Sequence, residues 1–281
     1  MTEPKVTDAC GFIGLGSQGA PIARRMIDAG LNVTLWARRP QSLDAYRQTA
    51  ARFAESPAAL AAATQHIGVC VLNDDDVKQV CAELIPAMRP GGRIAIHSTV
   101  HPNTCQQLAA QAGERGIALI DAPVSGGAPA AEAGALTVMV GGEMGDFEAA
   151  RPIFNTFGRL IVHLGPVGAG QIAKLINNTL MAANLAMAYN ALQAGGKLGL
   201  ARAALVQLLG ASSAGSFALD VCARMSSPTG FAHGASLLAK DVRLLGEVMH
   251  AGSRDFEGLR AAATPFLGLA LGEPEPGDLA D

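Results

Sequence analysis

The sequence predicts an α/β fold in two parts: a mostly parallel sheet with helices on both faces, followed by an all-helical part. Short β-rich runs alternate with helical patterns over the first 165 residues, and such alternation is typical of a parallel sheet covered on both faces. Beyond residue 164 the alternation stops and the chain reads as helical. The chain has 281 residues, 49% of them hydrophobic, which is enough for two domains. We expect these domains at residues 1–165 and 166–281.

The strands of the first part are expected where apolar and β-branched residues form short runs. These runs lie at residues 10–15, 31–36, 67–72, 93–96, 117–120, 136–140 and 160–164. Helical patterns fill most of the intervals between them. The first expected helix has Pro21 in its first turn and Gly30 at its end, which are favoured positions for proline and glycine.

The second part begins with a long expected helix. From Gln171 the sequence reads as helical for about 25 residues, or roughly 40 Å. Residues 175–196 carry no charge and are long enough to span a bilayer. They also include five amide side chains, whose burial in lipid would be costly. We therefore expect a helix that is buried in protein, and no membrane partner.

Composition and charge exclude other classes of function. The formal net charge is −3 and aromatic residues make up 4% of the chain, so little is available to neutralise phosphates or to stack on bases. Nucleic acid is therefore not an expected partner. The five cysteines are an odd number without a CxxC pair, which predicts reduced thiols and a cytoplasmic location. His97 and His101 are four residues apart but do not lie on one continuous helix, so no metal site is expected.

A glycine-rich motif follows the first expected strand and opens the first expected helix. Gly14, Gly16 and Gly19 have the G-x-G-x-x-G spacing. In this motif the first glycine makes a tight turn, the second lets the backbone approach a pyrophosphate, and the third packs the helix on the strand. Phosphate then binds at the helix N-terminus. The motif predicts a dinucleotide site, and the alternative is an ordinary glycine-rich turn.

The residues after the second expected strand bear on the choice of dinucleotide. NAD-binding proteins place a carboxylate there to hold the ribose 2′-hydroxyl group. This chain has no carboxylate at residues 36–40 and has Arg38 and Arg39 instead. Guanidinium groups pair well with phosphate, so NADP(H) is the expected cofactor, while the use of NAD(H) stays open. The alternative is a pair of solvated surface arginines.

Three further segments carry candidate site residues. DAPVSGG, at 121–127, ends in a turn whose Ser125 hydroxyl and backbone N–H groups suit an anion; the alternative is a tight surface turn. GAGQIAKLINN, at 168–178, places Lys174 and Asn178 on one helix face amid apolar residues. A lysine in such surroundings suits general acid–base work, and the alternative is a lysine whose ammonium group reaches solvent. Lys240 and Asp241, taken alone, read as a solvated helix face.

The order of these motifs resembles that of the β-hydroxyacid dehydrogenase family. GFIGLGSQG, HSTVHP, DAPVSGG, GAGQIAKLINN and KDVRLL occur in the family's order within residues 10–250. The family includes 3-hydroxyisobutyrate dehydrogenase, tartronate semialdehyde reductase, L-threonate dehydrogenase and glyoxylate/succinic semialdehyde reductase. The resemblance implies a doubly wound Rossmann domain, a long interdomain helix and a C-terminal all-helical domain, in homodimers or homotetramers. Two departures from the family are Gln18, where Met is frequent, and Ala37, where Asn is frequent.

The resemblance also implies roles for individual residues. Lys174 would be the catalytic acid/base and Asn178 would orient it or the substrate. Thr99 would approach the nicotinamide, and Lys240 would close over cofactor and substrate with the support of Asp241. The expected substrate-binding residues are Ser125, Gly126, Gly127 and Lys240. The expected cofactor-binding residues are Gly14, Leu15, Gly16, Ser17, Gln18, Gly19, Arg38, Arg39, Leu72, Asn73, Thr99, Lys240 and Asp241.

These expectations combine into one predicted function. The chain is expected to be an NADP(H)-dependent oxidoreductase that interconverts a small β-hydroxy acid and its aldehyde or semialdehyde. Its partners would be that small carboxylate or aldehyde and a second copy of the chain. One alternative is an imine reductase, although that related group usually lacks the lysine found at position 174. The other is an inactive cofactor-binding reader or scaffold, a class that also loses the lysine.

Overall fold

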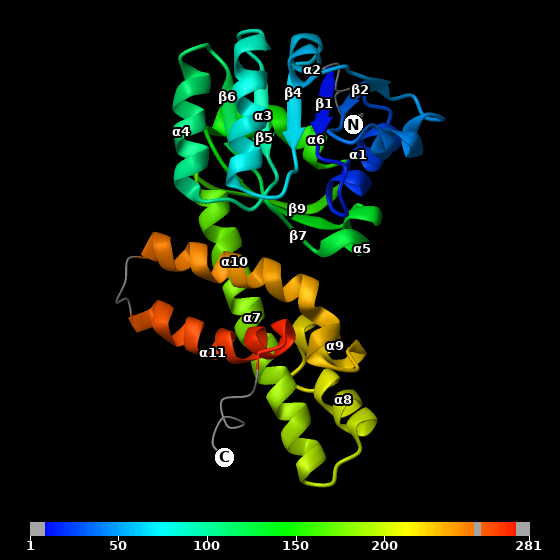
Figure 1. Ribbon diagram of the computed structural model, residues 1–281, viewed down its shortest axis with the longest axis vertical. Coiled ribbons are helices and arrows are strands. Elements are labelled where there is room, and N and C mark those ends of the chain that lie inside the picture. Colours follow the sequence, from blue (N-terminus) through cyan, green and yellow to red (C-terminus); the bar gives the residue numbers. More distant parts are fainter. Residues whose placement is uncertain (1–8, 250–253, 274–281) are drawn as a thin grey trace. The chain divides into compact units, whose positions relative to one another are not determined.

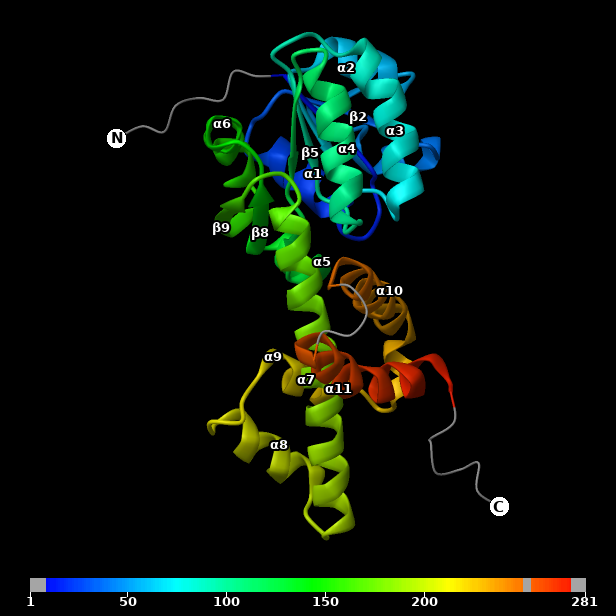
Figure 2. The same ribbon diagram turned by 90° about the vertical axis from the view of Figure 1, so that its left-hand side faces the viewer.

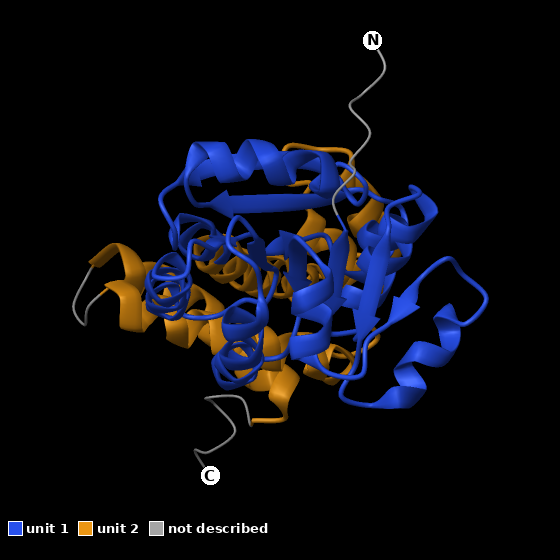
Figure 3. Ribbon diagram, turned by 90° about the horizontal axis from the view of Figure 1, so that it is seen from above, with its two compact units in different colours: residues 1–174 blue, residues 175–281 orange. Residues whose placement is uncertain are grey.

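The computed structural model describes residues 9–249 and 254–273, which form two compact units. The first unit comprises Met1–Lys174 and the second Leu175–Asp281 (Figure 3). The sequence places the boundary at 165, where the strands stop. The structure places it after Lys174, because the first turn of the long helix α7 (Ala169–Lys197) is hydrogen-bonded to the first unit.

A nine-stranded sheet forms the centre of the first unit (Figure 1). Its path runs β3-β2-β1-β4-β5-β6-β8-β7, with β9 paired to β8. Strands β1 to β6 are mutually parallel, whereas β8 pairs antiparallel with β6 and β7 and parallel with β9. The strands are β1 (Cys10–Ile13), β2 (Val33–Trp36), β3 (Arg52–Phe53), β4 (His66–Val69), β5 (Arg93–Ile96), β6 (Ala118–Asp121), β7 (Val124–Ser125), β8 (Leu136–Gly141) and β9 (Gly158–Gly165).

Every strand expected from an apolar run is present, with ends that differ by a few residues. The first expected strand is shorter than its run because Gly14 has a φ of 98° and turns the chain toward α1. The sequence missed β3 and β7, which have two residues each and are too short to show a period.

Helices cover both faces of this sheet (Figure 2). Neighbouring residues along a strand point to opposite faces, so Phe12 joins one buried cluster and Ile13 the other. The cluster around Phe12 includes side chains of α1 and α6, and the cluster around Ile13 includes side chains of α2, α3 and α4. These helices are α1 (Gly19–Asp28), α2 (Pro57–Ala63), α3 (Asp74–Ala87), α4 (Pro102–Gly113), α5 (Gly127–Glu132) and α6 (Met144–Phe154), and a 3-10 helix η1 spans Pro40–Tyr46. The predicted doubly wound fold is thus confirmed.

Helices and the loops between them make up the described residues of the second unit, with no strand among them. Most of α7 belongs to it, and at 29 residues this helix is slightly longer than expected. Side chains of α7, α9, α10 and α11 form its core, in which Leu185, Leu219, Leu238 and Phe266 are buried. The other elements are α8 (Arg202–Gly210), α9 (Phe217–Arg224), η2 (Pro228–Phe231), α10 (Ala232–Met249) and α11 (Arg254–Leu271). Among the described residues, no helix has both the length and the hydropathy that crossing a membrane requires.

Candidate active site

The glycine-rich loop between β1 and α1 has the geometry that its motif predicts. A side chain at Gly14 would collide with the Cys70 carbonyl, and one at Gly19 would collide with the Gly14 carbonyl, so both close approaches require glycine. A Cβ at Gly16, by contrast, would meet nothing within 4 Å. Gly16 and Ser17 are exposed, Leu15 is half-buried, and Nε2 of Gln18 is buried without a hydrogen-bond partner in the described part of the chain.

This loop fits a dinucleotide phosphate on three counts. The space at Gly16 lies beside the N-terminus of α1, where backbone N–H groups and the helix dipole attract an anion. No acidic side chain lies in the first turn of α1 to oppose one. A bound phosphate oxygen would also give the unsatisfied Gln18 amide an acceptor.

Arg38 and Arg39 are exposed just beyond the end of β2. The Arg38 guanidinium lies 3.3 Å from the carboxylate of Asp76, in the first turn of α3. The Asp76 N–H in turn donates to the side chain of Asn73, the N-cap of that helix. The proximity of Arg38 to this acidic residue is not predictable from the sequence, because the two residues belong to different βα units.

Predicted cofactor residues also follow the next two parallel strands. Leu72 is exposed and Asn73 half-buried after β4, while Thr99 is half-buried after β5. A hydrogen bond joins these two loops, since the Val71 N–H donates to the Ser98 hydroxyl at 2.8 Å. The predicted residues therefore gather at the carboxyl ends of the parallel strands, which is where open α/β sheets bind ligands.

The predicted substrate turn lies between β7 and α5. Ser125 ends β7, and Gly126 and Gly127 follow it with φ angles of 131° and 70°. Such angles favour glycine, and both glycines are exposed. The turn thus presents a half-buried hydroxyl and exposed backbone N–H groups next to each other.

Lys174 lies in the second turn of α7 and is only 9% exposed. The start of this helix is held by the buried Asp121 at the end of β6. Its two carboxylate oxygens accept hydrogen bonds from the N–H groups of Gly168 at 2.6 Å and Gln171 at 2.7 Å. Burial raises the pKa of Asp121 to about 6, and these hydrogen bonds oppose the rise.

Three predicted residues form a polar cluster within the helical unit. Nδ2 of Asn178 donates to Oδ2 of Asp241 at 2.5 Å, and Nζ of Lys240 lies 3.3 Å from the other carboxylate oxygen. Taken alone, the Lys240–Asp241 pair suggests a solvated helix face. This interpretation is wrong for Asp241, which is only 2% exposed. Asn178 stands one helical turn after Lys174 in the uninterrupted α7.

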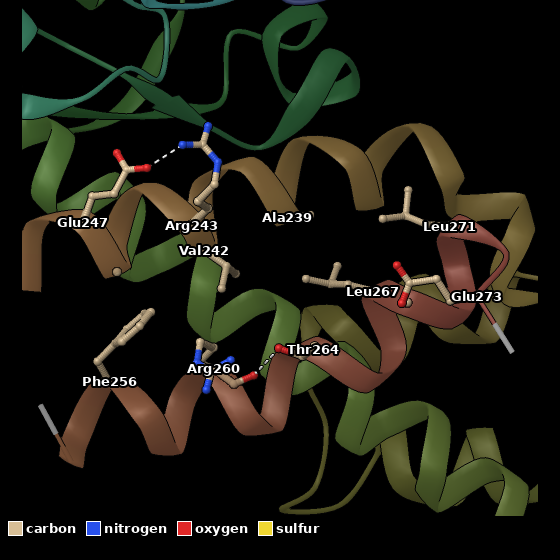
Figure 4. Close-up of a pocket in the computed structure, with 12 residues that line it drawn as sticks. Ala239, Val242, Arg243, Glu247, Phe256, Arg260, Thr264, Leu267, Leu271 and Glu273 are labelled. Atoms are coloured by element: carbon tan, nitrogen blue, oxygen red, sulfur yellow. Dashed lines mark hydrogen bonds and ion pairs between the residues drawn. The ribbon is translucent and has the colours of Figure 1, made fainter. Parts of the chain in front are cut away.

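The helical unit also contains a pocket of about 680 Å³ between α10 and α11 (Figure 4). No predicted site residue lines it. Two arginines of its lining are already paired, Arg243 with Glu247 and Arg260 with Glu257.

Two residues that support the site, Asp121 and Gln171, are not among those that the sequence predicts. Asp121 begins the DAPVSGG segment, and Gln171 lies at the start of the expected long helix. A signal was present for both, since an acid at the end of a buried strand and a glutamine among apolar helical residues require partners. His97 and His101 both make structural hydrogen bonds. Nδ1 of His97 donates to the Ala122 carbonyl, and the side chain of His101 caps the N-terminus of α4.

Comparisons with known proteins show which families the two parts of the chain match. The family model for the NAD-binding domain of 6-phosphogluconate dehydrogenase matches residues 9–165, and that for the NAD-binding region of NADP-dependent 3-hydroxyisobutyrate dehydrogenase matches residues 168–273. The chain is 36% identical to an NAD-dependent L-serine dehydrogenase of Pseudomonas aeruginosa, over 92% of this chain and 89% of the relative.

Solved structures of similar proteins share the fold of this chain over most of its length. A Mycobacterium tuberculosis 3-hydroxyisobutyrate dehydrogenase determined with L-serine has a TM-score of 0.81 and 25% identity, over 94% of both chains. Psf3, in complex with NADP+ and 2-OPP, has a TM-score of 0.80 and 26% identity, over 92% of both chains. A Streptomyces aurantiacus imine reductase shares the fold, with a TM-score of 0.68, at only 18% identity. The chain therefore belongs to the β-hydroxyacid dehydrogenase family of nicotinamide-dependent oxidoreductases.

Proposed function

We propose that this enzyme uses NADP(H) to interconvert a small β-hydroxy acid and its aldehyde or semialdehyde, with Lys174 as the general acid/base. The observation that carries the proposal is the position of Lys174. It is buried in a helix whose first turn is hydrogen-bonded to the carboxyl-terminal edge of the sheet. Predicted cofactor residues lie at this same edge of the first unit.

A bound nicotinamide would supply a hydride to the substrate carbonyl carbon in reduction and would accept one from the hydroxyl-bearing carbon in oxidation. The Lys174 ammonium group gives its proton to the carbonyl oxygen during reduction, and the amine takes a proton from the hydroxyl group during oxidation. The Ser125 hydroxyl and the N–H groups of Gly126 and Gly127 hold the substrate carboxylate. Asn178 orients the lysine or the substrate, and Lys240, paired with Asp241, closes over substrate and cofactor.

The preference for NADP(H) follows from charge. Arg38 and Arg39 offer two guanidinium groups beside the end of β2. Residues 36–40 include no carboxylate that could hold a ribose 2′-hydroxyl group. Asp76 pairs with Arg38 and reduces its positive potential, so we propose that NAD(H) can also serve as cofactor. The similar L-serine dehydrogenase, which is NAD-dependent, supports this second use.

We also propose an oligomeric state and a cellular location for the enzyme. We place the enzyme in homodimers or homotetramers, because α8 has no buried residue although most of its side chains are apolar. We place it in the cytoplasm, because Cys70, Cys81, Cys105 and Cys222 are thiols rather than disulfides. Burial raises the pKa of Cys70 and of Cys81 to about 12, so neither is a reactive nucleophile.

The two alternatives are less well supported. Imine reductases share this fold, but the similarity at 18% identity extends to the fold alone, and Lys174 counts against that chemistry. An inactive reader or scaffold would not need a buried lysine one helical turn before Asn178.

A substrate screen with one variant tests the proposal. NADPH oxidation would be followed with glyoxylate, succinic semialdehyde, tartronate semialdehyde and methylmalonate semialdehyde. The reverse reaction would be followed with the corresponding hydroxy acids and, given the relatives' names, L-serine. On the best substrate, Lys174→Ala should lower kcat by about 10²- to 10⁴-fold while NADPH affinity stays near that of the wild type. A variant that turns over within a few-fold of the wild type would refute the role of Lys174.

A further inference from the structure

The start of α7 is capped from far away in the sequence. Asp121 lies 47 residues before Gly168 and 50 before Gln171, yet it accepts the N–H groups of both. Helix N-termini are ordinarily capped by the residue that immediately precedes the first turn. Here the capping carboxylate is fixed at the end of a central strand and is fully buried. The cap therefore anchors the helix to the sheet and does more than complete its first turn.

The side chain of Gln171 makes a second connection to the same edge of the sheet. Its Oε1 accepts the Val100 N–H at 3.1 Å, and its Nε2 donates to the Ser98 carbonyl at 2.9 Å. Gln171 is fully buried, so both amide groups are used inside the protein. Ser98 and Val100 flank Thr99, the residue expected beside the nicotinamide.

These contacts extend to the neighbouring loop. The Ser98 hydroxyl accepts the Val71 N–H at 2.8 Å, one residue before Leu72. The loops after β4 and β5, the end of β6 and the first turn of α7 thus form one continuous hydrogen-bonded network. Gln171 and Lys174 are three residues apart, which places them on the same face of the helix.

We propose that Asp121 and Gln171 are positioning residues that hold Lys174 at the height and rotation from which it reaches the substrate oxygen. This inference rests on the proposed function, because it acts through Lys174. A buried carboxylate is costly to the folded state, and burial accordingly raises its pKa. An apolar contact would join helix and sheet without that cost, but it would leave the rotation of the helix less sharply defined than two directed hydrogen bonds do.

Two variants test the network separately. Asp121→Asn keeps the size of the side chain but replaces one acceptor oxygen with a donor. Gln171→Met keeps the approximate length and removes both side-chain hydrogen bonds. Thr179→Val is the matched control, since Thr179 is fully buried in the same helix and its hydroxyl donates to the Leu175 carbonyl of that helix. Each change would also be made in a Lys174→Ala background.

Both test variants should lower kcat by about 10- to 100-fold, because small displacements of a reacting group have large effects on rate. The dissociation constant of NADPH and the KM should change less than threefold, and Thr179→Val should keep the wild-type kcat. In the Lys174→Ala background the same two changes should have no further effect on kcat. A wild-type kcat in both test variants, or an equal loss in the Lys174→Ala background, would overturn the inference.

The two proposals fail in different ways. If Lys174→Ala alone keeps the wild-type kcat, the proposed function is wrong. If Lys174→Ala is impaired while Asp121→Asn and Gln171→Met are fully active, only the positioning role is wrong. A folding defect in one of the two variants leaves the other to decide, and circular dichroism with NADPH titration identifies such a defect before kinetics are measured.

Discussion

Arg38 combines high exposure with a charged neighbour. Its side chain is 77% exposed, and its guanidinium lies 3.3 Å from the Asp76 carboxylate. An exposed pair of this kind contributes little to stability, so the arginine is available to a ligand at small cost. A phosphate brings more charge than one carboxylate and can accept both arms of the guanidinium group.

Reversing this charge should change the cofactor preference. A charge-assisted hydrogen bond is worth about 1.5–3 kcal/mol, so Arg38→Asp should weaken NADPH binding by at least about tenfold and leave NADH binding nearly unchanged. Arg151→Asp is the matched control, because Arg151 is also exposed and also pairs with a carboxylate, that of Glu148. Fluorescence titration with both cofactors gives the affinities. Equal affinity of the wild type for NADPH and NADH would contradict the assignment.

Asp121 should make stability depend on pH. Its pKa in the folded protein is about 6, above its ordinary value of 3.8, so the folded state binds this proton more tightly than the unfolded state does. The contribution of Asp121 to the free energy of unfolding therefore increases as the pH falls from about 7 through 6 toward 4. Between pH 7 and 5 the wild type should gain about 1 kcal/mol relative to Asp121→Asn.

Urea denaturation of both proteins at several pH values measures this difference. Every other titrating group is common to the two proteins, so the difference isolates residue 121. A gap between wild type and variant that stays constant from pH 7 to 5 would show that the carboxylate titrates at its ordinary pKa.

The elements of the fold differ in how well the sequence predicts them. Long apolar runs such as those that form β1 and β8 were found, because burial on both faces leaves a continuous signal. The sequence predicts a strand at 117–120 and a turn at the end of DAPVSGG, whereas β7 is a separate antiparallel strand between them. A two-residue strand is defined by its partner, and the pairing with β8 is not visible in local sequence.

The residues of the candidate site also differ in how well the sequence predicts them. Gly14, Gly16, Arg38 and Lys174 were predicted because their chemistry is contained in short spacings. The network around Asp121 was not, because its partners are separated by 47 and 50 residues and meet only in the folded sheet. The start of α7 shows the consequence, since its hydrogen bonds to Asp121 tie it to the first unit, which extends to Lys174.

Two glycines of α7 should respond oppositely to the same substitution. A Cβ at Gly170 would collide with the Met139 carbonyl and lie 2.9 Å from an oxygen of Asp121, whereas one at Gly196 would meet nothing within 4 Å. Gly170→Ala should therefore lower the free energy of unfolding by about 1–3 kcal/mol. Gly196→Ala should raise it by about 0.5–1 kcal/mol, because alanine restricts the unfolded chain and favours the helix.

Urea midpoints at one protein concentration give both values. The kinetic readout separates position from stability: Gly170→Ala should lower kcat, and Gly196→Ala should not. Similar changes in both variants would mean that the start of α7 does not pack against the sheet as closely as the backbone contacts indicate.

At the scale of the whole molecule, the helical unit leaves apolar surface uncovered. Leu208 of α8 is 62% exposed and Phe217 at the start of α9 is 63% exposed, while Met187 on α7 is 55% exposed. None of the residues of α8 is fully buried, although Leu205, Val206 and Leu209 pack against the core of the helical unit. Large exposed apolar side chains on a folded unit favour an interaction surface there, and closed symmetry makes a second copy of the chain the commonest partner.

The enzyme should therefore have at least twice the mass of one chain in light scattering at micromolar concentration. Leu208→Glu places a charge on the uncovered face and should reduce the mass toward that of one chain, because desolvating an unpaired charge opposes association. Leu160→Glu is the control, since Leu160 is 54% exposed but lies on β9 of the other unit. NADPH affinity should persist in both variants, because neither Leu208 nor Leu160 is among the residues expected to bind the cofactor. A wild-type enzyme that scatters as a monomer would show that α8 is stable without a partner, and the exposed leucines would then need another explanation.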